Sequence, residues 1–472
     1  MKADATTPVP AVGLREPTIA QRIDGLPFSG FHWKVYLMST VALLFESTDG
    51  ALLAFVLPVV IVLWHLSDLQ TGVLASSLQF GQIIGYIGAG IIADTYGRRL
   101  LMMLAVATFS IFTVACAAAT NWIMFAVLRV AAGVGTAAEL GIIMPYLAEW
   151  MPLSARGRTT SSIGIQFTIG AFLAAVIGNV LIRPFHEGWR IALVLAGLPV
   201  LLLVWWRRGL LESPRWLENH GRHAEALRIV ELAEQRVGAR VTEAAALTDD
   251  EDLDPRMLSL GQKFRLLLSR PLRATTIGSW LMWLGVTAGQ YGFMLWLPTI
   301  LVKEGFTMTR SFSYSLLVYS AQIFAALTVA ALNGSGRVDR RLVIITGAAC
   351  AIVAALFISS ARTPTAIAEW GFVLTFCTTS AFNTSFVYTA EIYPTACRAI
   401  GLGVAAAIGR VGGVISPIGI GAIYPFYGVR GVGIFISTLL IVGVVAMSLF
   451  GTRTHDRSLE EVTRAQFRTT RG

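Results

Sequence analysis

Residues 148–156 are Ala148-Glu-Trp-Met-Pro-Leu-Ser-Ala-Arg156, and residues 390–398 are Ala390-Glu-Ile-Tyr-Pro-Thr-Ala-Cys-Arg398. Both stretches have a Pro three residues after the Glu and an Arg four residues after the Pro. The arginine pair Arg98-Arg99 recurs as Arg340-Arg341, and the offset is 242 residues in both cases. Unrelated segments would not keep one register at two places, so the chain is predicted to contain two parallel repeats.

The composition predicts that these repeats lie in a membrane. Hydrophobic residues make up 55% of the 472 residues and charged residues only 14%, whereas a soluble domain carries roughly 25% charged residues. Apolar runs near the roughly 20 residues that cross a bilayer recur from Val35 to Leu449. They lack the alternation of barrel strands, so the predicted fold is all-α, with about twelve spanning helices and about six in each repeat.

Polar segments divide the chain into five expected parts. They are an N-terminal tail over 1–32, helical bundles over 33–207 and 273–451, a central loop over 208–272, and a C-terminal tail over 452–472. The N-terminal segment lacks the apolar core of a signal peptide, so the first spanning helix is expected to stay in the mature chain. In the central loop, Ser213-Pro214 predicts the start of an amphipathic helix through Trp216, Leu227 and Leu232. The acidic run 249–252 is expected to be a solvated linker.

Arginines in alternate loops predict the orientation of the chain. The richer loops hold Arg98, Arg99, Arg156, Arg158, Arg337, Arg340, Arg341 and Arg398. The positive-inside rule places these loops and both termini in the cytoplasm, with the chain in the inner (plasma) membrane. This distribution also accounts for the net charge of +9, so no nucleic-acid partner is expected.

No metal or other cofactor is expected. The four cysteines have no CxxC spacing and no nearby His cluster, so packing is favoured over a metal or redox role. The six histidines lie outside the predicted helix cores, which leaves no ligand set for a metal or a haem. An integral-membrane enzyme is disfavoured, because no nucleophile, His or metal constellation lies near the spans.

Three motifs in order carry a resemblance to a known family. They are Gly90-Ile-Ile-Ala-Asp94-Thr-Tyr-Gly97-Arg98-Arg99, then Arg129-x-x-x-Gly133-x-Gly135, then Leu211-Glu-Ser-Pro-Arg-Trp-Leu217. Together they resemble the major facilitator superfamily of secondary transporters over nearly the whole chain. The resemblance implies two six-helix halves that rock around a site near the membrane midplane.

The first of these motifs implies a conformational latch for the outward-open state. Gly90 allows helices to approach closely, and Asp94 can pair with a loop arginine and a helix N-terminus. Gly336 takes the place of Asp94 in the second repeat, so that copy is expected to latch more weakly. The alternative is that the arginines only set the topology. The expected latch residues are Gly90, Asp94, Gly97, Arg98, Arg99, Glu149, Arg156, Glu391 and Arg398.

Two further motifs narrow the resemblance. Phe45-Glu46-Ser-Thr-Asp49-Gly50 resembles the paired-acid motif of aromatic acid:proton symporters and nicotinate-type permeases, with Glu in place of Asp at the first acid. Ile408-Gly-Arg410-Val-Gly-Gly-Val-Ile-Ser-Pro417 resembles a broader group that includes organic anion and cation transporters. Two acids one turn apart near mid-membrane do not both ionise easily, so one is expected to hold a proton. A packing hydrogen bond without a transport role is the alternative.

Three more charges lie inside predicted spans. Arg410 needs an anion, which is either a substrate carboxylate or one of the two acids in the first helix. Arg129 resembles the fourth-helix Arg that is linked to proton coupling in this superfamily, with a structural role as the alternative. Glu139 follows ten residues later, about 80° round the helix, so these two are not expected to pair. Glu139 is a candidate for a proton relay or for an interhelical bond.

Polar side chains in the other spans complete the candidate substrate site. Gln290 and Tyr291 lie on a face of the seventh expected helix that Met294 shares by three- and four-residue spacing. The further candidates are Gln166, Tyr319, Gln322, Asn383 and Tyr388. For the aromatic residues, packing or interface anchoring is the alternative.

These inferences predict a proton-coupled symporter that imports a small organic anion, an aromatic or heteroaromatic carboxylate. Arg410 is expected to hold the carboxylate, and Asp49 and Glu46 to carry the proton. The alternative is a carrier that binds an organic cation or zwitterion at the two acids. A membrane sensor without transport is less favoured, because no large signalling domain is present. The expected partners are a small molecule, protons and the lipid bilayer, and the expected state is a monomer.

Overall fold

The described part of the chain is helical throughout. In this computed structural model the described residues are 17–185, 187–239, 260–334, 338–394 and 397–453. The first half contains α2 (Gly30–Trp64), α3 (Asp68–Tyr96), α4 (Arg98–Cys116), α5 (Trp122–Trp150), α6 (Leu153–Ser161), α7 (Ile163–Ile177), α8 (Gly188–Ala196) and α9 (Leu202–Gly209). The second half contains α13 (Arg273–Lys303), α14 (Met308–Gly334), α15 (Arg340–Ser360), α16 (Pro364–Ile392) and α17 (Arg398–Phe450).

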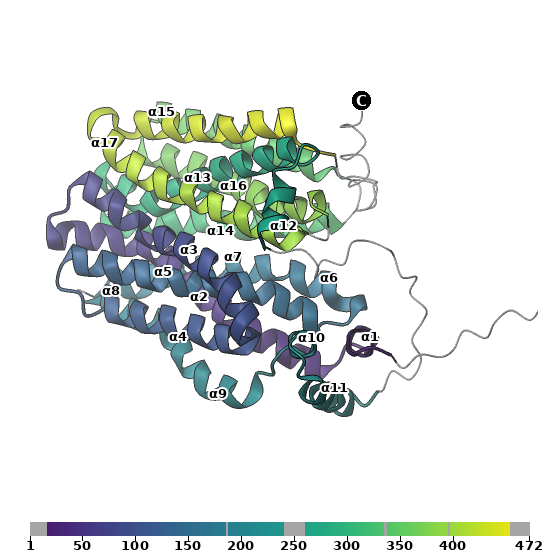
Figure 1. The fold of residues 1–472 in the computed structure, drawn as a ribbon. Helices are drawn as coiled ribbons and strands as arrows, with labels where there is room; N and C mark the ends of the chain where they lie inside the picture. Colours follow the sequence, from purple (N-terminus) through teal and green to yellow (C-terminus); the bar gives the residue numbers. More distant parts are fainter. Residues whose placement is uncertain (1–16, 186, 240–259, 335–337, 395–396, 454–472) are drawn as a thin grey trace, which may run out of the picture.

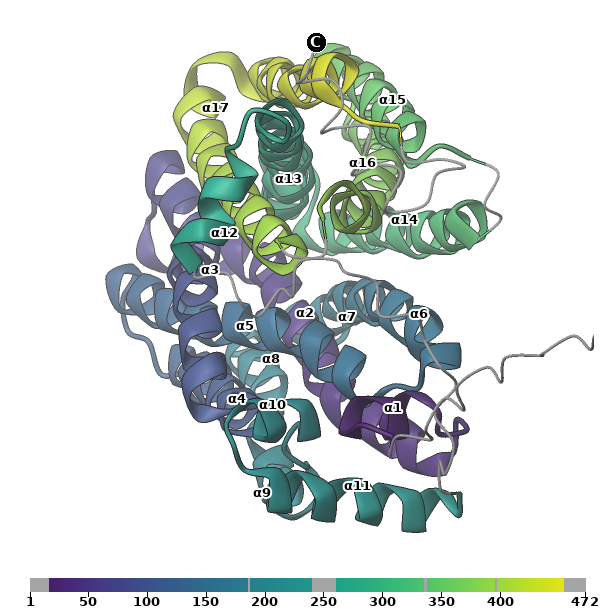
Figure 2. The same cartoon turned by 45° about the vertical axis from the view of Figure 1, so that its right-hand side comes forward.

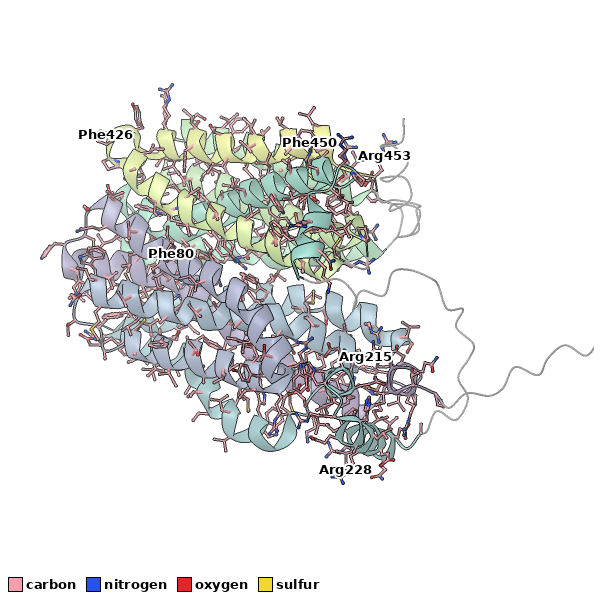
Figure 3. All side chains as sticks on the ribbon, viewed as in Figure 1. Phe80, Arg215, Arg228, Phe426, Phe450 and Arg453 are labelled. Carbon is pink, nitrogen blue, oxygen red and sulfur yellow. The ribbon has the colours of Figure 1, made fainter. Side chains whose placement is uncertain are left out.

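Four short helices lie at one end of the molecule, which we call the loop-helix end. They are α1 (Ile19–Asp24), α10 (Pro214–Asn219), α11 (His223–Val237) and α12 (Leu260–Leu267), visible at the right of Figure 1. Figure 3 shows Arg215 and Arg228 at this end, whereas Phe80 lies along the bundle. The Phe80 side chain is exposed although it is large and apolar. An exposed apolar flank with charges at one end fits a protein surrounded by lipid.

The two halves form separate bundles that pack side by side. Figure 2 shows the purple-to-blue first half below the green-to-yellow second half. Between the halves α3 packs against α17, α7 packs against α14, and α2 packs against α13. Counted among the spanning helices, the second helix of each half (α3 and α14) thus contacts the fifth helix of the other half (α17 and α7, respectively). The first spanning helices of the two halves, α2 and α13, also meet. This reciprocal pattern is what two parallel repeats around one axis produce.

The last helix contains two membrane crossings. α17 has 53 residues, but the backbone of Gly428 inside it is not helical, with φ of 53°. Left-handed φ values strain residues that carry a Cβ, so glycine is suited to this tight reversal. The break agrees with the two spans predicted from the sequence, 399–424 and 429–451.

The long helices differ in how many polar side chains they carry. By length and hydropathy, eight helical segments in the described residues are suited to cross a membrane, α17 being one of them. The long helices α3, α13 and α16 are not among these eight. They carry amide and hydroxyl side chains such as Gln82, Gln290 and Thr379, which are buried between the helices. Together with these three helices and the second crossing of α17, the predicted twelve-helix all-α fold is confirmed.

Small residues allow the first half to pack tightly. A Cβ added to Gly81 on α3 would lie 2.0 Å from the carbonyl oxygen of Val130 on α5 and 3.0 Å from the Cα atom of Gly133. No residue other than glycine therefore fits at Gly81 without moving a helix. Close backbone approach at small residues is the usual way in which membrane helices gain contact, because lipid is as apolar as their side chains.

The central loop differs from its prediction in one respect. Ser213 caps the N-terminus of α10 and Pro214 is its first residue, as the sequence predicted. However, the expected single amphipathic helix is two helices, because α10 ends at Asn219 and Gly221 turns the chain with φ of 74°. The apolar faces of α10 and α11 pack together with Ile19 and Ile23 of α1. The acidic run 249–252 lies outside the described residues.

Candidate functional site

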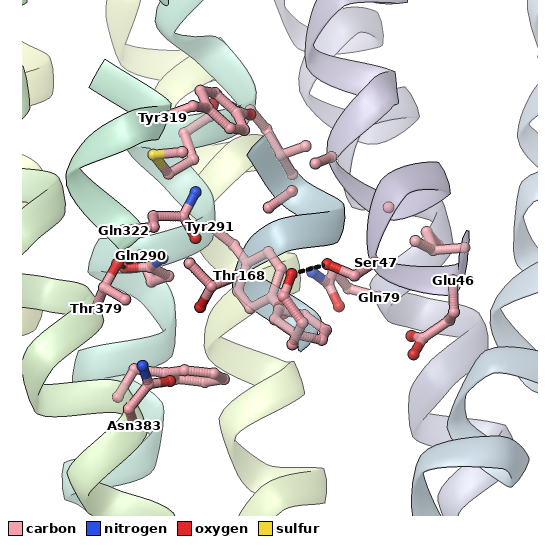
Figure 4. A pocket seen from close by; sticks show the side chains of 18 of the residues that line it. Glu46, Ser47, Gln79, Thr168, Gln290, Tyr291, Tyr319, Gln322, Thr379 and Asn383 are labelled. Carbon is pink, nitrogen blue, oxygen red and sulfur yellow. Dashed lines mark hydrogen bonds between the residues drawn. The ribbon is translucent and has the colours of Figure 1, made fainter. Parts of the chain in front are cut away.

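A cavity lies between the two halves (Figure 4). It has a volume of about 670 Å³, which includes space open to solvent. Helices α2, α3 and α7 line it from the first half, and α13, α14 and α16 from the second. The polar lining residues are Glu46, Ser47, Gln79, Gln82, Thr168, Gln290, Tyr291, Tyr319, Gln322, Thr379 and Asn383.

Arg410 is held beside this cavity by two tyrosines. The Nη1 atom of Arg410 donates a hydrogen bond of 2.8 Å to the hydroxyl of Tyr291, and Nη2 donates one of 3.4 Å to the hydroxyl of Tyr86. The guanidinium also lies over both rings, 5.3 Å and 5.8 Å from their centroids. The residue is 3% exposed, and no ion pair joins it to a carboxylate among the described side chains. Arg410 is therefore a buried cation with neutral partners.

Asp49 and Arg129 form an ion pair in the core of the first half. The Nη1 atom of Arg129 on α5 lies 2.7 Å and 2.8 Å from the two carboxylate oxygens of Asp49 on α2. A third hydrogen bond runs from Nη2 to the backbone carbonyl of Asp49. Both side chains are fully buried. The pair compensates both charges within the bundle and joins α2 to α5, which also pack against each other.

Two other buried acids lack such a partner. Glu46 is 3% exposed and lines the cavity, and its Oε2 atom accepts no hydrogen bond from a described residue. Glu139 on α5 is fully buried, and neither of its oxygens has a partner among the described residues. The prediction that Arg129 and Glu139 do not pair agrees with this geometry, because Arg129 is bonded to Asp49.

The structure brings most of the predicted substrate residues together. Gln290, Tyr291, Tyr319, Gln322 and Asn383 all line the cavity. The Tyr319 hydroxyl donates to the carbonyl of Met294, so its hydrogen is already used.

Two predicted substrate residues lie elsewhere. The amide of Gln166 donates to the hydroxyls of Tyr36 and Thr40, and the hydroxyl of Tyr388 accepts from the backbone N–H of Thr452. Neither side chain is part of the cavity wall. Both sit on the predicted helices but face neighbouring helices or chain segments of their own half.

Several cavity residues were not predicted as ligands from the sequence. Gln79 and Gln82 come from α3, and Thr379 and Phe382 come from α16. Tyr86, also on α3, was not predicted either; it accepts a hydrogen bond from Arg410 beside the cavity. Gln79 and Gln82 are three residues apart in an apolar stretch, which places two amides on one face of a membrane helix. That spacing was an available signal, since polar side chains in a span usually face a cavity or another helix.

The arginine–glutamate pairs of the repeat form equivalent contacts. Nη2 of Arg98 is 3.5 Å from Oε1 of Glu149, and Nε of Arg340 is 2.9 Å from Oε1 of Glu391. Each pair links the third helix to the fourth helix of its own half. Because these residues are related by the 242-residue offset, the contacts support the two-repeat prediction.

Glu212 joins the central loop to the first half. Its carboxylate accepts hydrogen bonds from the backbone N–H groups of Arg98 and Arg99 at the start of α4, and of Ser213. Burial raises the pKa of the Glu212 carboxyl above its ordinary value, although these hydrogen bonds and the Arg98 charge oppose the shift. Gly97, with φ of 100°, leaves room for this carboxylate, which lies 2.4 Å from the site of an added Cβ.

The remaining predicted latch residues are placed as follows. Arg156 donates to the carboxylate of Asp24 and to the carbonyl of Met151, and Nε of Arg398 donates to the carbonyl of Tyr393 at 3.3 Å. The side chain of Asp94, the surroundings of Gly90, and residue 336 lie outside the described part of the structure.

Two helical bundles that pack around a cavity between repeats are the arrangement found in secondary transporters. A family model for the sugar (and other) transporters matches residues 28–465, and the chain belongs to this family of the major facilitator superfamily. The chain is 28% identical over 445 residues to the niacin transporter NiaP of Acinetobacter baylyi, covering 94% of this chain and 99% of that relative.

Two further similarities extend this result. A gallate transporter of Pseudomonas putida is 28% identical over 407 residues, with 85% of this chain and 87% of the relative covered. The xylose transporter XylE from E. coli in a partially occluded inward-open conformation superposes with a TM-score of 0.74 at 17% identity, covering 91% of this chain and all of that one. The similarity to the XylE structure supports the assignment of the fold.

Proposed function

We propose that this protein imports a small organic anion, an aromatic or heteroaromatic carboxylate, together with protons. The observation that carries the proposal is Arg410, a buried guanidinium bonded only to neutral hydroxyls among the described residues. The carboxyl of Glu46 is close enough to interact electrostatically with this charge but forms no ion pair with it among the described residues. A buried charge without a direct counter-ion costs on the order of several kcal/mol, so this position favours an anionic ligand. A carboxylate could accept two parallel N–H bonds from the guanidinium, a geometry that fixes its orientation.

Aromatic side chains favour a ring as the body of the ligand. Phe167, Tyr291 and Phe382 line the cavity together with apolar residues such as Met294 and Leu295. The rings of Tyr291 and Phe382 are 6.2 Å apart in an edge-on arrangement. A flat ligand ring would add a further stacked or edge-on contact to such a group. Two relatives are named for niacin and for gallate, which are both single-ring carboxylates.

Glu46 and Asp49 are proposed to carry the proton. Asp49 is paired with Arg129, whereas Glu46, one helical turn away, lines the cavity. A proton on Asp49 would weaken its attraction to Arg129 and let α2 and α5 move relative to each other. One proton entering with one monovalent anion is electroneutral, so the membrane potential would not oppose import. Glu139, buried on the same helix as Arg129, is a candidate for a second step of the proton path.

The halves are proposed to rock around the cavity. At the end opposite the loop helices, Lys303 of α13 pairs with Asp68 of α3, and Asn179 donates to the carbonyl of Phe312 on α14. Both contacts join the two halves. Each arginine–glutamate pair at the loop-helix end lies within one half, so these pairs do not join the two halves and that end is free to open. In the outward-open state, the same residues are proposed to act as the latch. We assign the loop-helix end and both termini to the cytoplasmic side of the inner membrane, because basic loops favour that side.

Uptake by purified protein in proteoliposomes tests this function. Radiolabelled single-ring carboxylates and amines would be offered under an inward pH gradient, with and without a protonophore. Accumulation of carboxylates that the protonophore abolishes is expected. Accumulation of amines instead would indicate an organic-cation carrier that uses Glu46. Binding of carboxylates without any uptake would indicate a sensor.

A further inference from the structure

Four polar side chains form one wall of the cavity. Gln290 of α13, Gln322 of α14, and Thr379 and Asn383 of α16 all line it from the second half. We call this group the amide wall. Figure 4 shows these four residues on one side of the cavity and Glu46 on the other. The wall is therefore separate from the acids of the first half.

The amide wall has hydrogen-bonding capacity that the protein does not use. Gln322 is 4% exposed, and its amide has no hydrogen-bond partner among the described residues. Asn383 likewise has none. Nε2 of Gln290 lies 3.0 Å from the hydroxyl of Thr379, and Oε1 lies 3.2 Å from it. A carboxamide offers two N–H donors and two acceptor lone pairs, so Gln290 keeps at least one of each for a ligand.

Aromatic side chains adjoin this wall in the sequence and in space. Phe382 lies between Thr379 and Asn383 on α16, three residues after the first and one before the second. Tyr291 follows Gln290 and accepts the hydrogen bond from Arg410. A ring whose carboxylate meets Arg410 would therefore lie against Tyr291 and Phe382, with part of its edge toward the amides.

We infer that the amide wall selects carboxylates whose ring carries a polar atom on its edge, such as a hydroxyl group or a ring nitrogen. This inference rests on the proposed function and adds a specificity determinant to it. An unsubstituted ring would cover the amides without replacing their bonds to water. Leaving a buried donor or acceptor unpaired costs enough to lower affinity by about 10- to 100-fold.

Binding of three probes to the purified full-length protein tests the inference. They are benzoate, 3,4-dihydroxybenzoate and pyridine-3-carboxylate, which share a ring and a carboxylate but differ at the ring edge. We expect the wild-type protein to bind at least one of the two polar-ring acids about 10-fold or more tightly than benzoate. The affinity ratio is the dissociation constant for benzoate divided by that for the polar-ring acid. In Gln322→Met and Thr379→Val, which keep side-chain volume, this ratio should fall several-fold, because the polar-ring acid binds more weakly.

Thr378→Val is the matched control. Its hydroxyl donates to the carbonyl of Leu374 within its own helix and does not line the cavity. The ratio should stay at the wild-type value in this variant. Thermal unfolding of each variant would show whether it folds, and the wild-type comparison does not depend on any variant.

The outcomes separate this inference from the proposed function. Equal affinity for benzoate and both polar acids in the wild-type protein would overturn the inference and leave the proposed function standing. An unchanged ratio in both variants would overturn the assignment to the amide wall. Failure of all three acids to bind, with binding of amines instead, would overturn the proposed function itself.

Discussion

Arg129 holds both carboxylate oxygens of Asp49, at 2.7 Å and 2.8 Å, and neither side chain is exposed to solvent. A buried pair of this kind contributes little net stability over apolar residues, but removing one partner leaves an uncompensated charge. A proton that binds Asp49 neutralises its carboxylate and leaves the Arg129 charge uncompensated, as removal of the Asp49 charge would. Protonation of Asp49 is therefore expected to weaken the pair and change how α2 and α5 are held together. The pair joins α2 to α5, two helices of the first half that pack against each other.

Asp49→Asn is predicted to abolish accumulation driven by a pH gradient while leaving some exchange of substrate across the membrane. The variant removes the titrating group but not the cavity. Gradient-driven uptake and counterflow in proteoliposomes measure the two activities separately. Full accumulation by Asp49→Asn would contradict the coupling role. Asp49→Asn also leaves the Arg129 charge without its partner, which should lower the free energy of unfolding by about 3–5 kcal/mol. The double variant Asp49→Asn with Arg129→Gln should recover part of that loss.

Glu46→Gln is predicted to reduce both gradient-driven accumulation and stability less than Asp49→Asn does. Glu46 interacts electrostatically with Arg410 but forms no ion pair with a described residue, so replacing its carboxyl breaks no direct pair. The midpoint of thermal unfolding should stay close to the wild-type value. Accumulation should be reduced but present if Asp49 is the main proton site. Complete loss of coupling in Glu46→Gln with normal coupling in Asp49→Asn would reverse the assignment of the two acids.

Glu212 predicts a specific dependence of stability on pH. Burial raises its pKa in the folded protein above the ordinary value of 4.5, so the folded state binds its proton more tightly than the unfolded state does. Its contribution to the free energy of unfolding is thus fully present below pH 4.5 and falls as the pH rises through the folded-state pKa. Unfolding of wild-type protein and Glu212→Gln across this range measures the difference, which should change with pH. A constant difference would show that Glu212 does not titrate differently on folding.

The pair between Asp68 and Lys303 predicts how the cavity is reached from outside. Asp68→Asn should weaken the contact between the halves at that end and favour states open to the outside. A single cysteine at Ala51 in the cavity, in a variant without the four native cysteines, would report this by its labelling rate with an impermeant maleimide. The rate should rise in Asp68→Asn. It should not change in Glu225→Gln, whose pair with Arg222 is exposed and local, and equal rates in all three would refute the gating role.

The repeat made much of the architecture predictable from sequence. The 242-residue offset identified Arg98 with Arg340 and Glu149 with Glu391, and each arginine does pair with its glutamate. The apolar run lengths predicted the helices, because crossing a bilayer fixes a minimum length. The break in the last helix also fell between predicted spans.

The site was less predictable, because helix crossing angles decide which faces meet. Glu46 and Asp49 were grouped by their spacing, but the structure turns Asp49 to Arg129 and Glu46 to the cavity. Gln166 and Tyr388 occupy plausible spans yet face helices or segments of their own half. Tyr86 became a partner of Arg410 only through contact between α3 and α17, which no local pattern encodes.

The central claim is that Arg410 binds the carboxylate of the substrate, and the affinity of Arg410→Ala for the anionic ligand tests it most directly. Removing one partner of a buried charged hydrogen bond typically costs about 2–5 kcal/mol, or roughly 30- to several thousand-fold in affinity. Arg410→Lys should recover only part of that loss, because an ammonium cannot make the two parallel contacts of a guanidinium. The double variant Arg410→Ala with Asp49→Asn should not restore binding. Loss of ligand-induced thermal stabilisation in Arg410→Ala is the predicted result, and unchanged anion affinity in that variant would contradict the account.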